Sequence, residues 1–181
     1  MASYWEKRAY AELSSEPMDL SRRGLVYQAS LDRTLGNGAS ASAQMQTGSK
    51  NTVIYLREGT ATSESVSFKL FEVSATSGVS GSAQGQNLNR LVTDSASISQ
   101  TVFSASVTGA SVTNLLAYDI IPGGNKSGGT ALCNKVRTLQ PDTKYLFEFR
   151  NLGSGTTLVH ATLVFSEGEP ETYNLIDAVE N

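Results

Sequence analysis

The chain has 181 residues and a net charge of −3, and charged residues make up 17% of it, less than the ~25% usual for soluble domains. Its basic residues form no cluster longer than Arg22-Arg23, and no apolar run approaches the ~20 residues that cross a bilayer. We therefore expect no nucleic-acid partner and no membrane partner. Abundant Gly, Ser and Thr favour strands and turns over helices.

Residues 1–23 differ from the rest of the chain, because charged and aromatic residues concentrate there without strand-like alternation. One or two helical turns would fit before Pro17, which ends them. A segment this short cannot bury a core of its own, so it is either a frayed tail or an arm that anchors on a neighbouring subunit. The candidate anchors are Tyr4, Trp5, Tyr10, Leu13, Met18 and Leu20.

From residue 24 onward the apolar residues alternate with polar ones, as they do in half-buried strands. Turn clusters rich in Gly, Asn and Ser separate these runs, and Gly36-Asn37-Gly38 is a strong one. The pattern predicts one antiparallel sandwich over 24–166, followed by a peripheral tail at 167–181. The expected strands are 24–32, 39–46, 52–57, 63–74, 98–107, 114–121, 131–137, 145–150 and 156–165.

The clearest strand begins at Tyr145, where Tyr145, Phe147 and Phe149 alternate with other residues and therefore share one face. The glycine-containing turn at 151–155 and the apolar run at 156–165 follow, which predicts a long antiparallel hairpin.

Four local features complete this interpretation of the sequence. The apolar set in 63–74 changes phase at Leu70-Phe71, which predicts a β-bulge there. Residues 57–60 are expected to form a turn. Residues 76–86 consist largely of Gly, Ser, Ala and Gln, which predicts a long exposed loop, and 87–92 suit a short strand or a helical turn.

Residues that could perform chemistry are few. His160 is the sole histidine and Cys133 the sole cysteine, so no intrachain disulfide can form and a His/Cys metal site lacks ligands. We expect His160 on the surface of a strand and Cys133 as a buried thiol. The carboxylates are scattered, and no phosphate loop or calcium loop is present, so we expect no enzyme activity, no metal and no cofactor. The carboxylates considered are Asp32, Glu58, Glu64 and Glu72.

Leu139, Pro141, Thr143 and Tyr145 resemble the L-x-P-x-T-x-Y run of fibronectin type III-like sandwiches. In those domains the tyrosine forms a "tyrosine corner", in which its hydroxyl bonds to backbone a few residues upstream. The resemblance implies that Tyr145 bonds to the backbone near Leu139. It concerns a device of the fold and not a function.

A second resemblance covers roughly residues 24–165. The run 31–40 looks like the "T-L-x-x-G-x-S" first hairpin of small tailed-phage virion proteins, and 47–50, 68–73 and 139–147 fit the same pattern. The chain is thus similar to capsid decoration (cement) or accessory head proteins of tailed bacteriophages. The resemblance implies a jelly-roll-like sandwich, with an immunoglobulin or fibronectin III-like sandwich as the alternative.

The same resemblance implies a role on the capsid surface of a virion, with the major capsid protein as partner and a dimer or trimer as the working form. Residues 1–8 carry no apolar signal-peptide region, which suits synthesis in the host cytoplasm. Two other roles stay open: a tail protein, or a module that binds a receptor or carbohydrate. A carbohydrate site needs an exposed aromatic platform with polar neighbours, whereas most aromatic residues here have the spacing of core residues.

Overall fold

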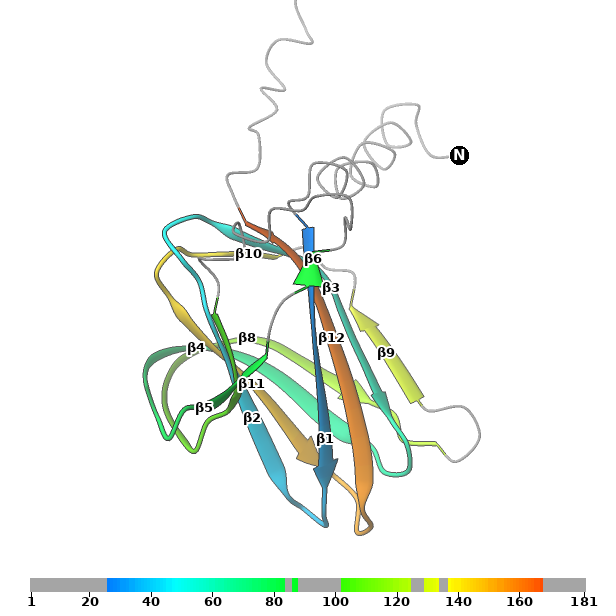
Figure 1. Ribbon diagram of the computed structural model, residues 1–181. Helices are drawn as coiled ribbons and strands as arrows, with labels where there is room; N and C mark the ends of the chain where they lie inside the picture. The colour runs from blue at the N-terminus through cyan, green and yellow to red at the C-terminus, as the bar shows by residue number, and fades with distance from the viewer. Residues whose placement is uncertain (1–25, 84–85, 88–101, 125–128, 134–136, 168–181) are drawn as a thin grey trace, which may run out of the picture.

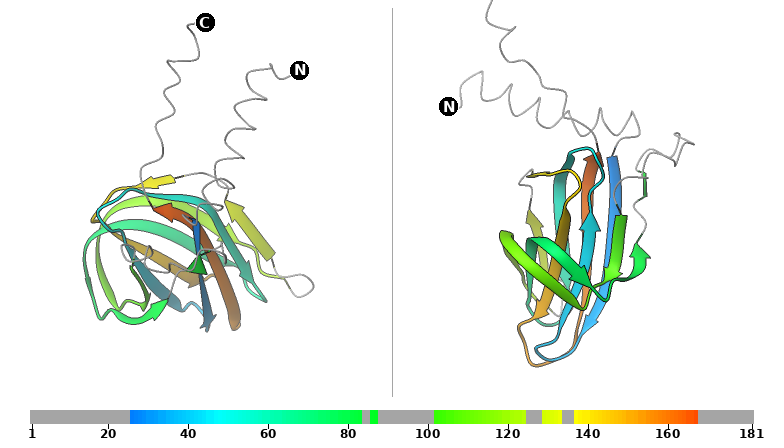
Figure 2. Two further views of the ribbon diagram at one scale, coloured as in Figure 1. Left: turned by 45° about the horizontal axis from the view of Figure 1, so that its top comes forward. Right: turned by 90° about the vertical axis from the view of Figure 1, so that its left-hand side faces the viewer.

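The computed structural model describes residues 26–83, 86–87, 102–124, 129–133 and 137–167. All regular structure in these ranges is β-strand, and the strands form two antiparallel sheets packed face to face (Figures 1 and 2). The predicted all-β sandwich is therefore confirmed. The arm at 1–23, with its six candidate anchors, and most of the tail at 167–181 lie outside the described residues.

The first sheet, called sheet A, has the order β10-β3-β12-β1-β6, and β9 also pairs with β3. Its strands are β1 (Val26–Leu35), β3 (Thr52–Ala61), β6 (Gln86–Asn87), β9 (Gly129–Cys133), β10 (Arg137–Leu139) and β12 (Thr157–Glu167). The second sheet, sheet B, has the order β5-β7-β2-β11-β4-β8. Its strands are β2 (Ser40–Gln46), β4 (Val66–Ser77), β5 (Ser80–Ala83), β7 (Val102–Ser106), β8 (Gly109–Ile121) and β11 (Lys144–Asn151).

The topology is that of a jelly roll. Four successive strand pairs, β1/β2, β3/β4, β8/β9 and β11/β12, each place one strand in sheet A and one in sheet B. This gives the order β9-β3-β12-β1 in one sheet and β2-β11-β4-β8 in the other, the double-sheet arrangement of jelly rolls. The predicted jelly-roll-like fold is confirmed over the immunoglobulin-like alternative.

The core lies between the sheets and contains the predicted aromatic face of β11. Tyr145, Phe147 and Phe149 are all buried there, and Phe68 of β4 packs on the last two, with ring centroids 6.0 and 5.2 Å apart. From sheet A, Tyr27 and Phe165 face them across the sandwich. Alternation along the strand therefore predicted correctly that these three aromatic side chains share the core face.

The predicted hairpin between β11 and β12 is wrong. β11 pairs with β2 and β4 in sheet B, whereas β12 pairs with β1 and β3 in sheet A. The turn at 152–156 carries the chain from one sheet to the other. Alternation reports which side chains share a face, and it does not report which strand lies alongside.

Residues 57–60 are also not a turn, because β3 runs unbroken to Ala61. Gly59 sits inside this strand, where a Cβ would lie 2.4 Å from Cδ1 of the buried Ile121 on β8. The glycine therefore allows a close approach between the two sheets and does not mark a chain reversal.

The predicted loop at 76–86 contains a strand, β5, which pairs with β7 at one edge of sheet B. Its small side chains bury little, but backbone pairing alone suffices for an edge strand. The bulge predicted at Leu70-Phe71 is confirmed between β4 and β8: Leu70 faces Ala117 and Phe71 faces Leu115. The extra residue is therefore Leu116 of β8, since β4 keeps a continuous register with β11. Of 87–92, Asn87 lies in β6 and the others lie outside the described residues.

At one end of the sandwich, the lower end in Figure 1, three connections meet around Asn151. Its Nδ2 donates to the carbonyls of Leu35, Gly36 and Gly155 at 3.2, 2.8 and 2.7 Å, and its Oδ1 accepts from the Gly153 N–H at 2.9 Å. The Gly155 N–H also donates to Oε1 of Glu64, from the β3–β4 connection. Asn151 thus fixes the crossings between the sheets.

Candidate interaction surface

The tyrosine corner predicted at Leu139, Pro141 and Tyr145 is present. The backbone N–H of Gln140 donates to the hydroxyl of Tyr145 at 2.8 Å, one residue from the predicted position. Asp142, with φ of 49°, completes the turn after Pro141. Burial raises the pKa of Tyr145 above 10.0, and the charge of Glu72 raises it further. These residues are structural and build no binding site.

The outer face of sheet A carries a chain of polar side chains on β1 and β12. Nδ1 of His160 lies 2.6 Å from Oδ1 of Asp32, and Nε2 of His160 lies 3.1 Å from the Thr162 hydroxyl. The Thr162 hydroxyl is 3.3 Å from that of Ser30. The register places both pairs directly across from each other on neighbouring strands.

This order, carboxylate, imidazole and hydroxyl, is also that of a hydrolase triad. A triad needs free N–H donors beside the hydroxyl to stabilise an oxyanion. β12 is paired on both sides, with β1 and β3, so its amides belong to the ladders. The side chains of His160 and Asp32 are also 47% and 71% exposed. We interpret this row of side chains, from Asp32 to Ser30, as a set of hydrogen bonds on a solvated surface.

The four carboxylates considered from the sequence are not brought together. Asp32 lies on β1, Glu58 on β3, Glu64 in the β3–β4 connection and Glu72 on β4. Within the described residues, no group of three or more His, Cys, Asp or Glu side chains could hold a metal ion. The described part of the chain also contains no helix long and apolar enough to span a bilayer. The prediction that Cys133 is a buried thiol stays a prediction, because its side chain is not among those that the structure describes.

The outer face of sheet B is of a different kind, because a group of apolar side chains lies on it beside polar ones. Phe71 and Val73 of β4 point away from the core, as does Leu146 of β11. Val107 covers part of them: its N–H donates to the Ser42 carbonyl at 3.2 Å, just where the chain crosses from β7 toward β8. Beyond this small second cluster the apolar surface continues uncovered onto β8.

We call this continuation the β8 face. It consists of the outward-pointing side chains of β8, which the register sets beside Ser67, Lys69, Phe71 and Val73 of β4. Each of them is about half exposed, which is unusual for large apolar side chains gathered on one strand. They are Val112, Leu115, Tyr118 and Ile120, with exposed fractions of 52, 52, 52 and 51%.

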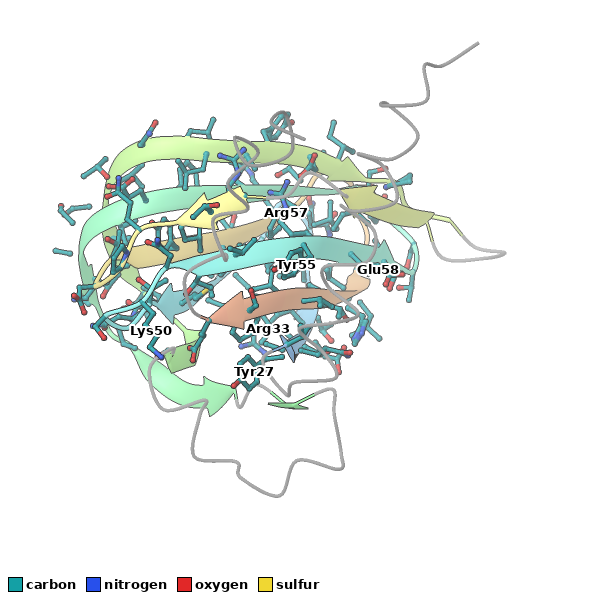
Figure 3. All side chains as sticks on the ribbon, turned by 90° about the horizontal axis from the view of Figure 1, so that it is seen from above. Tyr27, Arg33, Lys50, Tyr55, Arg57 and Glu58 are labelled. Carbon is teal, nitrogen blue, oxygen red and sulfur yellow. The ribbon has the colours of Figure 1, made fainter. Side chains whose placement is uncertain are left out.

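One charge pair lies beside the β8 face. Nζ of Lys69 is 3.7 Å from Oε1 of Glu148 on β11, and it is also 5.9 Å from the centre of the Tyr118 ring. The opposite face of β8 carries Asp119, whose Oδ2 lies 3.8 Å from Nη1 of the buried Arg57. Figure 3 shows Arg57 between β3 and the strands of sheet B. The β8 face itself therefore carries no net charge.

Sequence reasoning assigned residues 114–121 to a strand but did not find this surface. The signal was present in the doublets Leu115-Leu116 and Ile120-Ile121. Two consecutive apolar residues in a strand point to opposite faces, so such doublets indicate apolar residues on both faces of β8.

Comparison with known proteins leaves the family open. No protein-family model matches the sequence, and no curated protein matches it. Among solved structures, a Yersinia pseudotuberculosis-derived mitogen is similar with a TM-score of 0.32 and 8% identity, over 82% of this chain and 91% of that chain.

Viral capsids are also among the similar structures. The acidic stable capsid structure of Helicobacter pylori bacteriophage KHP30 has a TM-score of 0.36 and 10% identity, over 78% of this chain and 87% of that chain. Desmodium yellow mottle tymovirus has a TM-score of 0.25 and 11% identity, over 79% and 81%. At these scores, likenesses to a mitogen and to capsids carry no argument about function.

Proposed function

We propose that this protein is a non-enzymatic structural protein of a virion, and specifically a decoration (cement) protein that binds the major capsid protein and stabilises the phage head from its outer surface. The observation that carries the proposal is the β8 face, a half-exposed apolar surface without net charge. Surfaces of this kind are used for contacts between proteins. The sequence resemblance to tailed-phage decoration proteins supplies the partner.

The proposed attachment segment is the arm at 1–23, whose aromatic and apolar residues include Trp5 and Tyr10. Trp and Tyr contribute strongly to binding energy when they anchor in a partner. The strands that build the described sandwich begin at Val26, after the arm. Attachment through the arm therefore requires no change in the sandwich.

The test uses capsids assembled from the major capsid protein of the same genome. Full-length protein is expected to sediment with them, whereas a variant without residues 1–17 is expected to stay in solution with the circular dichroism of a folded β-protein. A matched variant, Trp5→Ala with Tyr10→Ala, is expected to bind at least tenfold more weakly. Undiminished binding by the truncated variant would contradict the role of the arm. No binding by the full-length protein would contradict the decoration role.

A second candidate function is a receptor-binding or carbohydrate-binding module of a phage tail. Tyr118 favours it, because this tyrosine is half exposed on the outer face of sheet B with Lys69 and Glu148 nearby. However, the Lys69 ammonium lies 5.9 Å from the ring centre, where a sugar would have to stack. A glycan array distinguishes the two functions: binding that Tyr118→Ala abolishes supports the module, and no binding at high protein concentration excludes the glycans tested.

A further inference from the structure

Within the described residues, the second edge of β8 is open. β8 is the last strand of sheet B, and none of the strands that the structure describes pairs with its side away from β4. It is also the longest strand, with 13 residues from Gly109 to Ile121. An open edge presents a row of backbone N–H and C=O groups that can pair with a further strand.

The sequence of β8 does little to protect this edge. Proteins usually guard an open edge with Lys, Pro or charged side chains that repel another strand. The segment Gly109–Ile121 contains no Lys, Arg, Glu or Pro, and its one charged residue, Asp119, points inward to Arg57. Two protective features remain: the inward charge of Asp119, and irregular backbone, since register shifts occur between Ser111 and Ala117.

Beyond these shifts β8 is regular. Five consecutive residues, Ala117 to Ile121, face Leu70 to Val66 of β4 without interruption. Tyr118 and Ile120 are the outward side chains of this stretch. The regular, uncharged part of the edge therefore coincides with one end of the β8 face.

We propose that the partner at this edge is a second copy of the chain, whose β8 pairs antiparallel with the first about a twofold axis. The inference rests on the proposed function, in which the protein acts through association, and it assigns the surface by which copies associate. The edge suits a strand that is extended, apolar on one face and without outward charge. β8 itself has these properties, so the surface is complementary to its own copy.

Charge does not oppose this pairing. Lys69, the nearest cation on the outer face, is already paired with Glu148 of the same copy. A twofold axis through the regular stretch places Tyr118 and Ile120 of both copies on one continuous outer surface, next to Leu115. The backbone pairing joins the two B sheets into one sheet that runs through the dimer. Pairing through one short stretch of strand gives a small protein–protein interface, below ~1,200 Å², so the dimer should dissociate on dilution.

The test uses the purified full-length protein without capsids, so that its outcome is independent of capsid binding. Sedimentation velocity over ~1–100 µM, the range suited to small interfaces, is expected to show a monomer–dimer equilibrium. The variant Tyr118→Lys with Ile120→Lys places four ammonium groups near the axis and is expected to remain monomeric throughout. The control Leu158→Lys changes a residue that is 44% exposed on the other sheet, and it is expected to dimerise like the wild type.

Cross-linking locates the contact directly. In a Cys133→Ser background, a variant with cysteines at both Tyr118 and Ile120 is expected to form intermolecular disulfides under mild oxidation, because antiparallel pairing about an axis at residue 118, 119 or 120 sets one of these positions beside its own copy or beside the other position. A cysteine at Leu158 is expected to form none. Any of three results overturns the proposal: a monomer at all concentrations, a dimer that survives both lysines, or cross-linking confined to Leu158→Cys. If the lysines instead abolish capsid binding of a monomeric protein, the occupant of the face is the capsid.

Discussion

Tyr145 couples the packing of the core to a hydrogen bond at the start of its own strand. Its ring is buried among the core aromatics, and its hydroxyl accepts the N–H of Gln140. Replacing Tyr145 with Phe keeps the ring but leaves that N–H without its partner. We expect the free energy of unfolding to fall by about 1–2 kcal/mol, measured by urea denaturation at pH 8.

The same residue makes stability depend on pH in the alkaline range. Its pKa is raised above 10.0 in the folded protein, chiefly by burial, so the unfolded chain loses the proton first as pH rises. This contribution to stability is complete below pH ~10 and is lost as pH rises through the folded pKa. Between pH 8 and 10.5 the wild type should therefore lose more stability than Tyr145→Phe. Equal losses would show that other groups control alkaline unfolding.

Two substitutions of Asn151 distinguish the loss of its hydrogen bonds from the effect of a charge at the same position. Its amide nitrogen donates to three carbonyl oxygens, which a carboxylate oxygen would instead repel. We expect Asn151→Asp to destabilise the protein by ~3 kcal/mol or more at pH 7, and more than Asn151→Ala does. Because protonation of the introduced carboxylate restores one hydrogen-bond donor, the difference in unfolding free energy between the two variants should become smaller below pH ~4. Urea midpoints of both variants at pH 7 and pH 4 check this, and an aspartate variant as stable as the alanine variant contradicts it.

At the scale of the element, β3 and β8 are coupled where Gly59 meets Ile121. A methyl group at Gly59 would lie 2.4 Å from Cδ1 of Ile121, which is buried. We expect Gly59→Ala to lower the free energy of unfolding by about 1–3 kcal/mol, because Ile121 must leave its preferred rotamer. In an Ile121→Val background, which lacks Cδ1, the same change should cost less. The four urea denaturation curves of this cycle measure the coupling, and additive costs would rule it out.

Elements were predictable from the sequence where side-chain spacing carries the information. The alternation of Tyr145, Phe147 and Phe149 predicted their burial. The phase shift at Leu70-Phe71 predicted the position of a register shift, but the extra residue lies in β8, and the phase shift in β4 itself arises because Phe71 and Val73 lie on the outer face. The continuation of β3 through Gly59 was not predictable, because the cause is Ile121, 62 residues later in the chain. The β8 face was predictable only in part: the doublets Leu115-Leu116 and Ile120-Ile121 indicate apolar residues on both faces of the strand, but half-exposed apolar residues have the same spacing as buried ones.

At the scale of the whole molecule, the two outer faces divide the surface by chemistry. Sheet A exposes the polar chain of Asp32, His160 and Thr162, whereas sheet B exposes the apolar β8 face. Solvated polar side chains suit the side that stays in water, and the apolar side suits contact with protein. Such a two-sided molecule can form pairs while keeping one broad face soluble.

The position of β12 in sheet A determines when this fold can form during synthesis. β12 is the last of the described strands in the chain, yet it lies between β1 and β3 and pairs with both. Until Thr157–Glu167 leaves the ribosome, β1 and β3 have no common neighbour, and the core side chains Tyr27 and Ile54 remain open to water. The nascent chain is therefore expected to be exposed to aggregation until β12 has been made.

A chain ending at residue 156 mimics this stage of synthesis. We expect it to show no cooperative urea transition and to aggregate when expressed alone, whereas the full chain folds. The full chain should refold from urea in milliseconds to seconds, as sandwiches with distant strand partners do, monitored by far-ultraviolet circular dichroism in stopped flow. A cooperative transition in the shortened chain would show that sheet B, with β2, β11 and β4 at its centre, holds the fold without β12.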